Sequence, residues 1–423
     1  MAHLTTRPRV LVLAHGLWYG GAQVSIVEFL RQIKDMADIQ VTVCHGSNPE
    51  FVRDIEGLGL GVSRVPYKLV YNYPDMEVQT ITDLIGETDV VWMTDIEYLA
   101  APEIKRIRDV PILAHLHSQA LICPDWNLLY GLQRICTGRC SPWRIIKCKQ
   151  LYFEHMAKWG LVSHCLAEIY RLLDFIKGPL DFFRWPIKRH VVDSIDRFVA
   201  NSDAVKDMHV AHMPCLRNRI SVVYNPIPVL TTGFVSRSLR LTHNANVGIK
   251  LVYAGGGSIA KGPHMLLMAL REVLRERPEV RVFCAKCKGT FIEDHIDKSN
   301  LGKIILLDKL TREEYHRLVS ESHVVVVPSI GFEAFSYVVL ESQYLGIPVV
   351  ASDIGGTREI IQHGTTGILV RPFDHVELSK GIMHLIDNLE NFDRSTIHRL
   401  TSEKFSNKLS SSKMMEALQS VSR

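Results

Sequence analysis

Short apolar runs alternate along the chain with longer segments in which apolar residues recur every three or four positions. The first run, 9–14, is followed by a loop with Gly20 and Gly21 and then by one such amphipathic segment. Buried parallel strands are continuously apolar, and the helices that connect them cover both faces of their sheet. Further strands are predicted at 40–44, 89–93, 112–115, 197–200 and 220–224. The pattern predicts an α/β fold with a parallel sheet.

The same arrangement begins again at 250–254, where an apolar run is followed by a glycine loop at 255–257 and a helical segment. A later helix start carries the capping-box spacing at Thr311 and Glu314. Strands are then predicted at 280–284, 303–307, 323–328, 347–351 and 367–370. The repeat predicts a second Rossmann-like domain.

We expect four regions: an N-terminal domain at 1–227, a linker at 228–247, a C-terminal domain at 248–400 and a final amphipathic helix at 401–423. The linker has no clear periodicity, and the final helix is a candidate for packing back on the N-terminal domain. Parallel sheets bind ligands beyond the carboxyl ends of their strands, next to helix N-termini that favour phosphate. Two such units facing each other predict a phosphate-containing ligand in a shared inter-domain cleft.

Composition limits the class of protein. The hydrophobic share of 47% and the charged share of 22% are those of a globular chain and exclude disorder. No apolar run approaches the ~18 residues of a membrane-spanning helix. Residues 1–9 are polar and lack the apolar region of a secretory signal. These features predict a cytoplasmic protein.

Segment 125–190, the basic insertion, carries eleven Lys and Arg against five acidic residues, a net charge of +6 in a chain of +4. Basic and aromatic side chains together suit anionic lipid headgroups, which predicts a peripheral protein on the inner membrane face. They equally suit an ordinary helical insertion whose aromatic residues are core. Nucleic acid is a poorer partner, because large aliphatic side chains dilute the charge. Four of the six tryptophans lie here: Trp126, Trp143, Trp159 and Trp185.

Nine cysteines in a chain without a signal indicate reduced thiols. One cluster is a candidate structural metal site, although its spacing is looser than that of usual zinc ligands. Its members are Cys123, Cys136, Cys140 and Cys148. The pair Cys284 and Cys287 reads as a buried strand end instead.

The most informative stretch is 328–341, which ends a strand, turns and begins a helix with two carboxylates eight residues apart. Glu333 lies in the turn and Glu341 on the helix. A carboxylate at Glu341 suits two ribose hydroxyls, Glu333 suits sugar hydroxyls, and the amides near Phe335 and Ser336 point at a diphosphate. The G-x-x-x-x-G-K-[ST] spacing of a Walker loop is absent from 255–257, which disfavours an ATPase.

The run that follows, 346–359, reads GIPVVASDIGGTRE. Together with Glu333 and Glu341 it resembles, nearly residue for residue, the retaining nucleotide-sugar-dependent glycosyltransferases of family 4, which have the GT-B fold of two facing Rossmann-like domains. The resemblance extends to Gly20-Gly21-Ala22, to Asn225-Pro226 and to Lys261-Gly262. It therefore covers nearly the whole chain.

The resemblance implies roles for several residues. Lys261 would contact the donor diphosphate, Glu341 the ribose, Glu333 the transferred sugar, and Gly20 and Gly21 the phosphates from the opposite domain. Charge builds on the leaving phosphate during transfer, where a cation and a helix dipole stabilise it. The scheme requires no metal, and the chain has no D-x-D motif of the metal-dependent type.

His117 ends a strand before the Cys123-Pro124 dipeptide and matches the family position that faces the sugar, which favours it over His115. One departure is that family members often carry an arginine five residues before the lysine. This chain has Gly256 there, so Lys261 is the one cation that matches.

The predicted activity is transfer of a hexosyl unit from a UDP- or GDP-sugar to an acceptor hydroxyl with retention of configuration. The basic insertion favours a lipid-linked glycan or a glycolipid as acceptor. Alternatives are a soluble acceptor, a GT-B nucleotide-sugar 2-epimerase and a non-catalytic sugar-nucleotide-binding subunit. Residues cannot name the sugar or the base, since the family contacts the base through backbone at 308–310.

Overall fold

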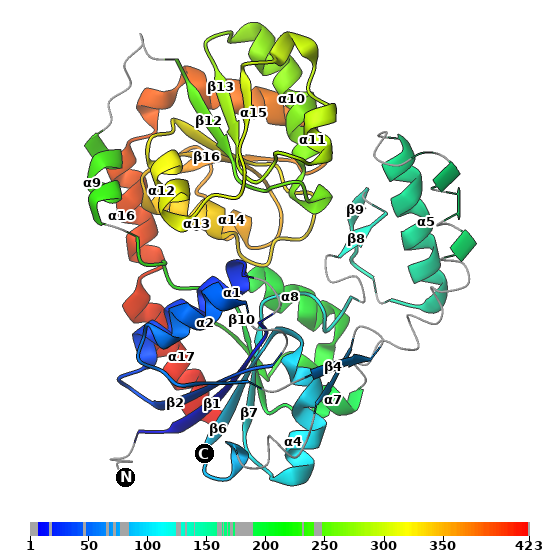
Figure 1. Ribbon diagram of the computed structural model, residues 1–423, viewed down its shortest axis with the longest axis vertical. Coiled ribbons are helices and arrows are strands. Elements are labelled where there is room, and N and C mark those ends of the chain that lie inside the picture. The colour runs from blue at the N-terminus through cyan, green and yellow to red at the C-terminus, as the bar shows by residue number, and fades with distance from the viewer. Residues whose placement is uncertain are drawn as a thin grey trace.

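The computed structural model has two α/β domains stacked along the long axis of the molecule, with the basic insertion projecting from one side (Figure 1). Both described chain ends lie in the N-terminal domain, which is the lower one in the figure. Trp126, Trp159 and Trp185 lie outside the described residues. The structure describes residues 7–16, 19–44, 48–64, 67–70, 73–76, 84–123, 128–131, 133–138, 140–158, 163, 165–166, 168–169, 172–173, 189–230, 232–240 and 248–421.

The N-terminal sheet has seven parallel strands in the order β11-β10-β7-β6-β1-β2-β3. Its strands are β1 (Arg9–Ala14), β2 (Asp38–Val43), β3 (Val62–Arg64), β6 (Val90–Thr94), β7 (Ile112–Leu116), β10 (Arg197–Ala200) and β11 (Ile220–Val222). Its helices are α1 (Gly21–Ile33), α2 (Pro49–Glu56), α4 (Ala101–Ile107), α7 (Arg189–Asp193) and α8 (Asp203–His212). A small antiparallel pair, β4 (Tyr67–Val70) and β5 (Tyr73–Met76), lies apart from this sheet.

The C-terminal sheet has six parallel strands in the order β14-β13-β12-β15-β16-β17. Its strands are β12 (Lys250–Tyr253), β13 (Arg281–Cys284), β14 (Ile304–Leu306), β15 (Val324–Val327), β16 (Val349–Ser352) and β17 (Gly367–Val370). Its helices are α10 (Pro263–Glu276), α11 (Phe291–Asp294), α12 (Arg312–Ser320), α13 (Tyr337–Tyr344), α14 (Thr357–Ile360), α15 (His375–Asp387) and α16 (Arg394–Lys404). The predicted capping box is present, because Thr311 and Glu314 bond each other's backbone amides.

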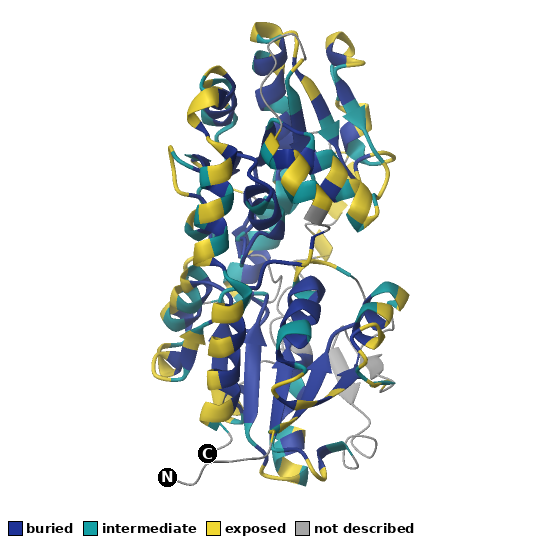
Figure 2. Cartoon of the chain, turned by 90° about the vertical axis from the view of Figure 1, so that its left-hand side faces the viewer, coloured by how far each residue is buried: buried dark blue, intermediate teal, exposed yellow. Residues whose placement is uncertain are grey.

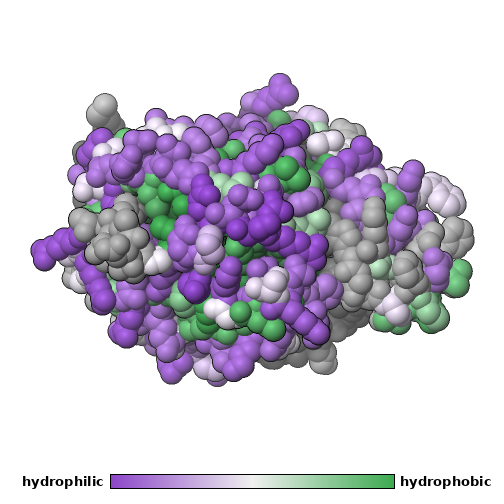
Figure 3. All heavy atoms as spheres, turned by 90° about the horizontal axis from the view of Figure 1, so that it is seen from above, coloured by the Kyte–Doolittle hydropathy of each residue, from purple (hydrophilic) through white to green (hydrophobic). Residues whose placement is uncertain are grey.

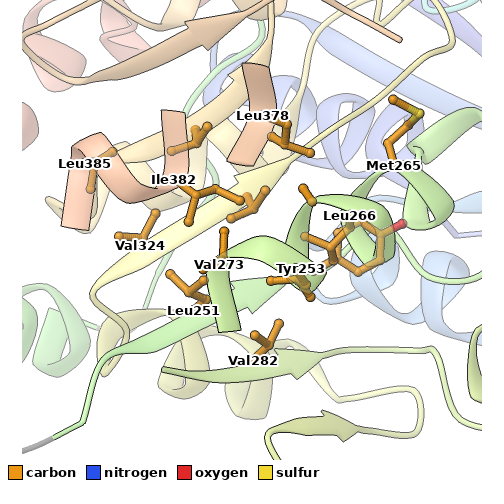
Figure 4. Close-up of a cluster of buried hydrophobic side chains, with 14 of the residues drawn as sticks. Leu251, Tyr253, Met265, Leu266, Val273, Val282, Val324, Leu378, Ile382 and Leu385 are labelled. Carbon is orange, nitrogen blue, oxygen red and sulfur yellow. The ribbon is translucent and has the colours of Figure 1, made fainter. Parts of the chain in front are cut away.

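Each sheet is covered on both faces, as continuously apolar strands require. In the N-terminal domain, alternate residues of β1 belong to two different clusters, one under α1 and α2 and one under α4, α7 and α8. In the C-terminal domain, α10 and α15 pack on one face, where Leu251, Val273 and Ile382 meet (Figure 4). Buried strands between helices with exposed outer sides are visible in Figure 2. The two-domain parallel α/β fold is confirmed.

Two further segments connect the domains. Within the segment expected as the linker, α9 (Thr232–Arg240) forms a helix that packs against α12 and α16. The final helix, α17 (Asn407–Val421), returns to the N-terminal domain, where Met414, Met415 and Leu418 join the cluster under α1. The chain therefore crosses between the domains twice.

The basic insertion packs against the C-terminal domain, although it interrupts the N-terminal one. It contains a short antiparallel pair, β8 (Leu129–Tyr130) and β9 (Arg134–Ile135), and α5 (Pro142–Lys158). Leu129 belongs to the cluster under α10, and Tyr152 and Met156 of α5 pack against the same cluster. Of its described aromatic residues, these contacts make Tyr152 part of the core, whereas Trp143 is 74% exposed.

We expect Leu418→Ala to lower the free energy of unfolding by about 2–5 kcal/mol, because the side chain is fully buried between α17 and the N-terminal cluster. Leu409→Ala is the matched control, since Leu409 lies on the same helix and is 44% exposed. Chemical denaturation of both variants provides the measurement. Equal losses in the two variants would contradict a packing role for this face of α17.

Candidate active site

The carboxyl ends of the two parallel sheets face each other, because the contacts between the domains come from residues that follow strands. Glu50, after β2, pairs with Lys309, after β14, at 3.5 Å. The Ser202 hydroxyl, after β10, donates to the carbonyl of Ala334, after β15, at 2.7 Å. Ligands of open parallel sheets bind at these ends, so the candidate site lies between the two sheet edges.

Glu333, in the loop between β15 and α13, pairs with Lys261, in the loop between β12 and α10. Lys261 Nζ lies 2.7 Å from Glu333 Oε1 and 3.0 Å from Oε2. The Ser329 hydroxyl donates to Oε1 at 2.6 Å. Glu333 is buried, so the cation and the hydroxyl replace the water that a carboxylate otherwise requires. The residues predicted to hold the sugar and the diphosphate are therefore in direct contact.

The loop that carries Glu333 is held against both domains. Phe332 and Ala334 pack on the N-terminal cluster that includes Leu116 and Ala200. Behind the loop, Gly355 has a φ of +53°, and a Cβ there would lie 2.0 Å from the carbonyl oxygen of Glu333. Only glycine combines that backbone conformation with so close an approach. The glycine pair of the 346–359 run therefore shapes the position of Glu333.

Glu341 is buried on α13 and pairs with an arginine that the sequence did not single out. Arg312 donates to Glu341 Oε1 at 3.2 Å, and His316 Nε2 lies 3.6 Å from the same oxygen. Burial opposes the charge of Arg312, but the nearby carboxylate of Glu341 raises the pKa of this arginine above its usual value. A charge in the first turn of a helix reads as solvated, which is why the pattern missed Arg312.

The N-terminus of α13 lies opposite the glycine loop of α1. A Cβ at Gly21 would lie 3.4 Å from Cδ2 of Tyr337, the first residue of α13. In the described part of the chain, the amides of Phe335 and Ser336 donate to no acceptor. The Phe335 ring is buried beside Tyr224 and Phe405, so Phe335 presents its backbone alone. Gly20, Gly21, Phe335 and Ser336 are thus brought together.

His117 follows β7 at the same edge of the N-terminal sheet. Its ring is nine-tenths buried, and neither ring nitrogen has a hydrogen-bond partner among the described residues. Burial lowers the pKa of His117 to about 3, so the imidazole is neutral near pH 7 and offers one donor and one acceptor. The neighbouring His115 is fully buried against Phe29 and Trp92 and is a core residue.

Glu359, the last residue of the 346–359 run, joins the two domains. Its carboxylate accepts from the backbone amides of Asp203 at 2.9 Å and Ala204 at 2.8 Å, at the N-terminus of α8. A carboxylate is favourable there because of the helix dipole and the free amides of the first turn. The contact holds the carboxyl end of β10, the strand beside β7 and His117, next to the loop of Glu333.

Family models match two parts of the chain. One described as Glycosyltransferase Family 4 matches residues 19–229, and one described as Glycosyl transferases group 1 matches residues 243–398. The chain belongs to glycosyltransferase family 4. The N-terminal model covers the loop of Gly20 and His117, and the C-terminal model covers Lys261, Glu333 and Glu341.

Individual relatives of this family 4 protein are distant. D-inositol 3-phosphate glycosyltransferase of Corynebacterium kroppenstedtii is 29% identical over 218 residues, 48% of each chain. The chain thus spans about half the length of the curated relatives it matches. Anabaena HepE in complex with UDP has a TM-score of 0.67 at 18% identity, covering 97% of this chain and 100% of that one. The lipopolysaccharide outer core galactosyltransferase WaaB has a TM-score of 0.61 at 15% identity, covering 97% and 99%. These structures share the GT-B fold.

The cysteine cluster of this glycosyltransferase is not supported as a metal site. Across the described ranges, no three potential ligands gather as a metal centre requires. Cys136 Sγ lies 3.5 Å from the Arg144 guanidinium, and Cys148 Sγ lies 3.1 Å from the carbonyl of Leu129. The thiols therefore contribute to the packing of the basic insertion, and none forms a disulfide.

Another buried polar pair at this edge was also missed. His15, after β1, lies with Nδ1 3.2 Å from Glu97 Oε1, after β6, and both side chains are almost fully buried. β1 and β6 are neighbours in the sheet and β7 follows them, so the pair shares the edge that His117 occupies. His15 and Glu97 belong to no sequence motif, so the sequence does not predict their contact. They meet because β1 and β6 are neighbours in the sheet.

Acidification should destabilise the protein partly through His117. Its folded-state pKa of about 3 lies below the usual value of 6.5, so between these values the unfolded chain binds a proton that the folded chain excludes. Stability is therefore present above pH 6.5 and is lost as pH falls, by up to ~1.4 kcal/mol per pH unit for this group. We expect His117→Gln to make the free energy of unfolding depend less steeply on pH, with up to one proton fewer taken up on unfolding. Chemical denaturation at pH 7, 6 and 5 provides the measurement. An unchanged slope would mean that folded His117 accepts the proton.

Proposed function

We propose that this protein is a retaining glycosyltransferase that moves a hexosyl unit from a UDP- or GDP-sugar to an acceptor hydroxyl. The observation that carries the proposal is the pairing of the buried Glu333 carboxylate with Lys261, in which Glu333 is held by a loop that packs on the opposite domain beside the strand end of His117. UDP and UDP-glucose are the ligands named for the Anabaena HepE structures, which supports UDP-sugars as the first donors to test. Retention of configuration follows from the family resemblance.

Donor binding redistributes the charges of the site. Lys261 Nζ lies 2.7 Å from Glu333 Oε1 and neutralises the carboxylate. A diphosphate carries more charge than one carboxylate and competes for the lysine, while sugar hydroxyls can donate to Glu333 in its place. The free amides at Phe335 and Ser336 and the dipole of α13 add to the same phosphate site. As the bond to the anomeric carbon breaks, negative charge grows on the leaving phosphate, and these fixed groups stabilise it more than they stabilise the bound donor.

His117 and Glu333 face the sugar in this proposal, and Glu341 holds the ribose with Arg312 behind it. A neutral imidazole suits a hydroxyl, since it can donate or accept without carrying charge into a buried site. Its unpartnered nitrogens support this role, because buried polar atoms normally have partners. The proton of the acceptor hydroxyl passes to the departing phosphate.

We propose that the acceptor is a lipid-linked glycan or a glycolipid, reached when the basic insertion docks on an anionic bilayer. Described residues of 165–173 are helical, and their apolar members recur on one face. Leu172 is 69% exposed and Ile169 48%, and Trp143 of α5 is also exposed. Figure 3 shows apolar residues at the outer edge of this lobe. Over the described residues, no helix is long and apolar enough to cross a bilayer.

A panel of UDP- and GDP-sugars, incubated with and without lipid extract, tests the proposal by released nucleotide. Release that depends on lipid extract supports it. Release that requires a water-soluble acceptor, such as the inositol phosphate in the name of the Corynebacterium relative, would indicate the soluble alternative. Conversion of the donor to its epimer without an acceptor would indicate a 2-epimerase.

The two glutamates should differ when neutralised. We expect Glu333→Gln to depress kcat, because it faces the reacting sugar, and Glu341→Gln mainly to raise the KM of the donor, because it holds the ribose. Removing one charge-assisted contact corresponds to about 10–150-fold. Glu313→Gln is the control, since Glu313 is exposed on α12 and pairs with Arg317. Negligible effects from both site variants, with circular dichroism unchanged, would remove them from the site.

Membrane docking should depend on the exposed apolar face. We expect the double variant Ile169→Ser with Leu172→Ser to co-sediment less with phosphatidylglycerol vesicles than the unmodified protein does. We also expect both proteins to bind phosphatidylcholine vesicles less than phosphatidylglycerol vesicles. Leu301→Ser with Val376→Ser is the matched control, because these side chains are equally exposed on the C-terminal domain. Absence of vesicle binding at low salt, or equal binding by both double variants, would favour a soluble acceptor.

A further inference from the structure

Lys286 is held in a conformation that is unusual for its residue type. Its φ is +59°, in the left-handed region that lysine rarely adopts. The loop after β13 maintains it, because the Lys286 amide donates to Asp308 O at 3.1 Å and the Cys287 amide donates to Leu307 O at 3.0 Å. Such backbone strain persists where the surroundings over-determine it, and it is common at ligand sites.

The stem of Lys286 lies along the glycine loop that follows β12. A Cβ at Gly256 would lie 3.5 Å from Lys286 Cδ, and a Cβ at Gly255 would lie 2.8 Å from Lys261 Cβ. The two lysines therefore flank successive glycines at the carboxyl end of one strand. Gly256 itself has a φ of +65°, and its carbonyl accepts from the Tyr253 hydroxyl at 2.8 Å, which fixes the loop between them.

The charge of Lys286 is not committed to any carboxylate in the described part of the chain, and its side chain is exposed. Lys288, two residues later in the same loop, pairs instead with Asp308 at 3.2 Å. Lys261 pairs with Glu333. A cation without a carboxylate partner among the described residues, beside this glycine loop, is complementary to an anion.

We propose that Lys286 is a donor-binding residue that contacts the diphosphate together with Lys261. The inference rests on the proposed function, since it assigns a further residue to that same site. Two cations from neighbouring loops can contact two phosphates at once, as the charge of a nucleoside diphosphate favours. Lys286 supplies from the adjacent loop the second positive charge that position 256, a glycine, lacks. An arginine at 256 would have to share the space along which the Lys286 stem runs.

Calorimetric titration with UDP and GDP tests this proposal in four variants: Lys286→Met, Lys286→Arg, Lys261→Met and the control Lys288→Met. Methionine keeps the Cβ and the stem, so the strained backbone is unchanged and the charge alone is removed. We expect Lys286→Met to weaken binding of the preferred diphosphate about tenfold or more. Lys286→Arg should restore most of the affinity, and Lys288→Met should leave it within about twofold, because the charge of Lys288 is already paired with Asp308.

The outcomes separate this proposal from the proposed function. If Lys261→Met weakens diphosphate binding and Lys286→Met behaves like Lys288→Met, the donor site stands and Lys286 does not belong to it. If the unmodified protein binds neither UDP nor GDP, the proposed function itself fails. Independent support would come from salt dependence. The affinity of Lys286→Met should fall less with added salt than that of the unmodified protein, because the variant lacks one electrostatic attraction that salt screens.

Discussion

The arrangement of the site depends on burying the Glu333 carboxylate between two domains. A carboxylate without water must be paired, and Lys261 and Ser329 provide its partners within 3.0 Å. Because these partners come from different loops of the C-terminal domain, the pairing fixes the loops after β12 and β15 relative to each other. Phe332 and Ala334, on either side of Glu333, then anchor the same loop on the N-terminal core. One buried charge thus couples the donor side of the site to the opposite domain.

Further contacts between the domains lie near the Glu333 loop and hold the domains together. Glu359 caps α8 from the C-terminal domain, and the Ser202 hydroxyl accepts from Val205 while donating to Ala334. Both contacts use helix N-terminal groups that would otherwise lack partners. At the far end of the chain, α17 crosses back and completes the cluster beneath α1. Separation of the domains would therefore expose helix amides as well as apolar surface, which favours the arrangement in which the domains are packed together.

The described part of the basic insertion is in part an ordinary packed element, as one interpretation of its composition expects. Tyr152 and Met156 pack on the C-terminal cluster, whereas Trp143, Ile169 and Leu172 remain exposed. Arg134 and Arg144 lie over the ring of Tyr130, at 5.1 Å and 5.2 Å, so part of the positive charge serves the fold of the insertion. The basic insertion thus contacts one domain, belongs to the other and presents apolar side chains outward.

The sequence by itself determined the elements and the family. Continuously apolar runs predicted every strand of the C-terminal sheet and all but β3 of the N-terminal sheet, because those strands are covered on both faces. The 346–359 run, together with Glu333 and Glu341, identified the glycosyltransferase family by resemblance. The short strands β3, β4, β5, β8 and β9 were missed, since they are too brief for a periodic pattern. Pairing was decided only by the tertiary structure: Arg312 with Glu341, Lys261 with Glu333, and Glu359 with α8. The physical reason is that these partners lie on different helices and loops, 29 or more residues apart in sequence. Only the order of the parallel strands in each sheet, together with the packing of one domain on the other, brings them into contact.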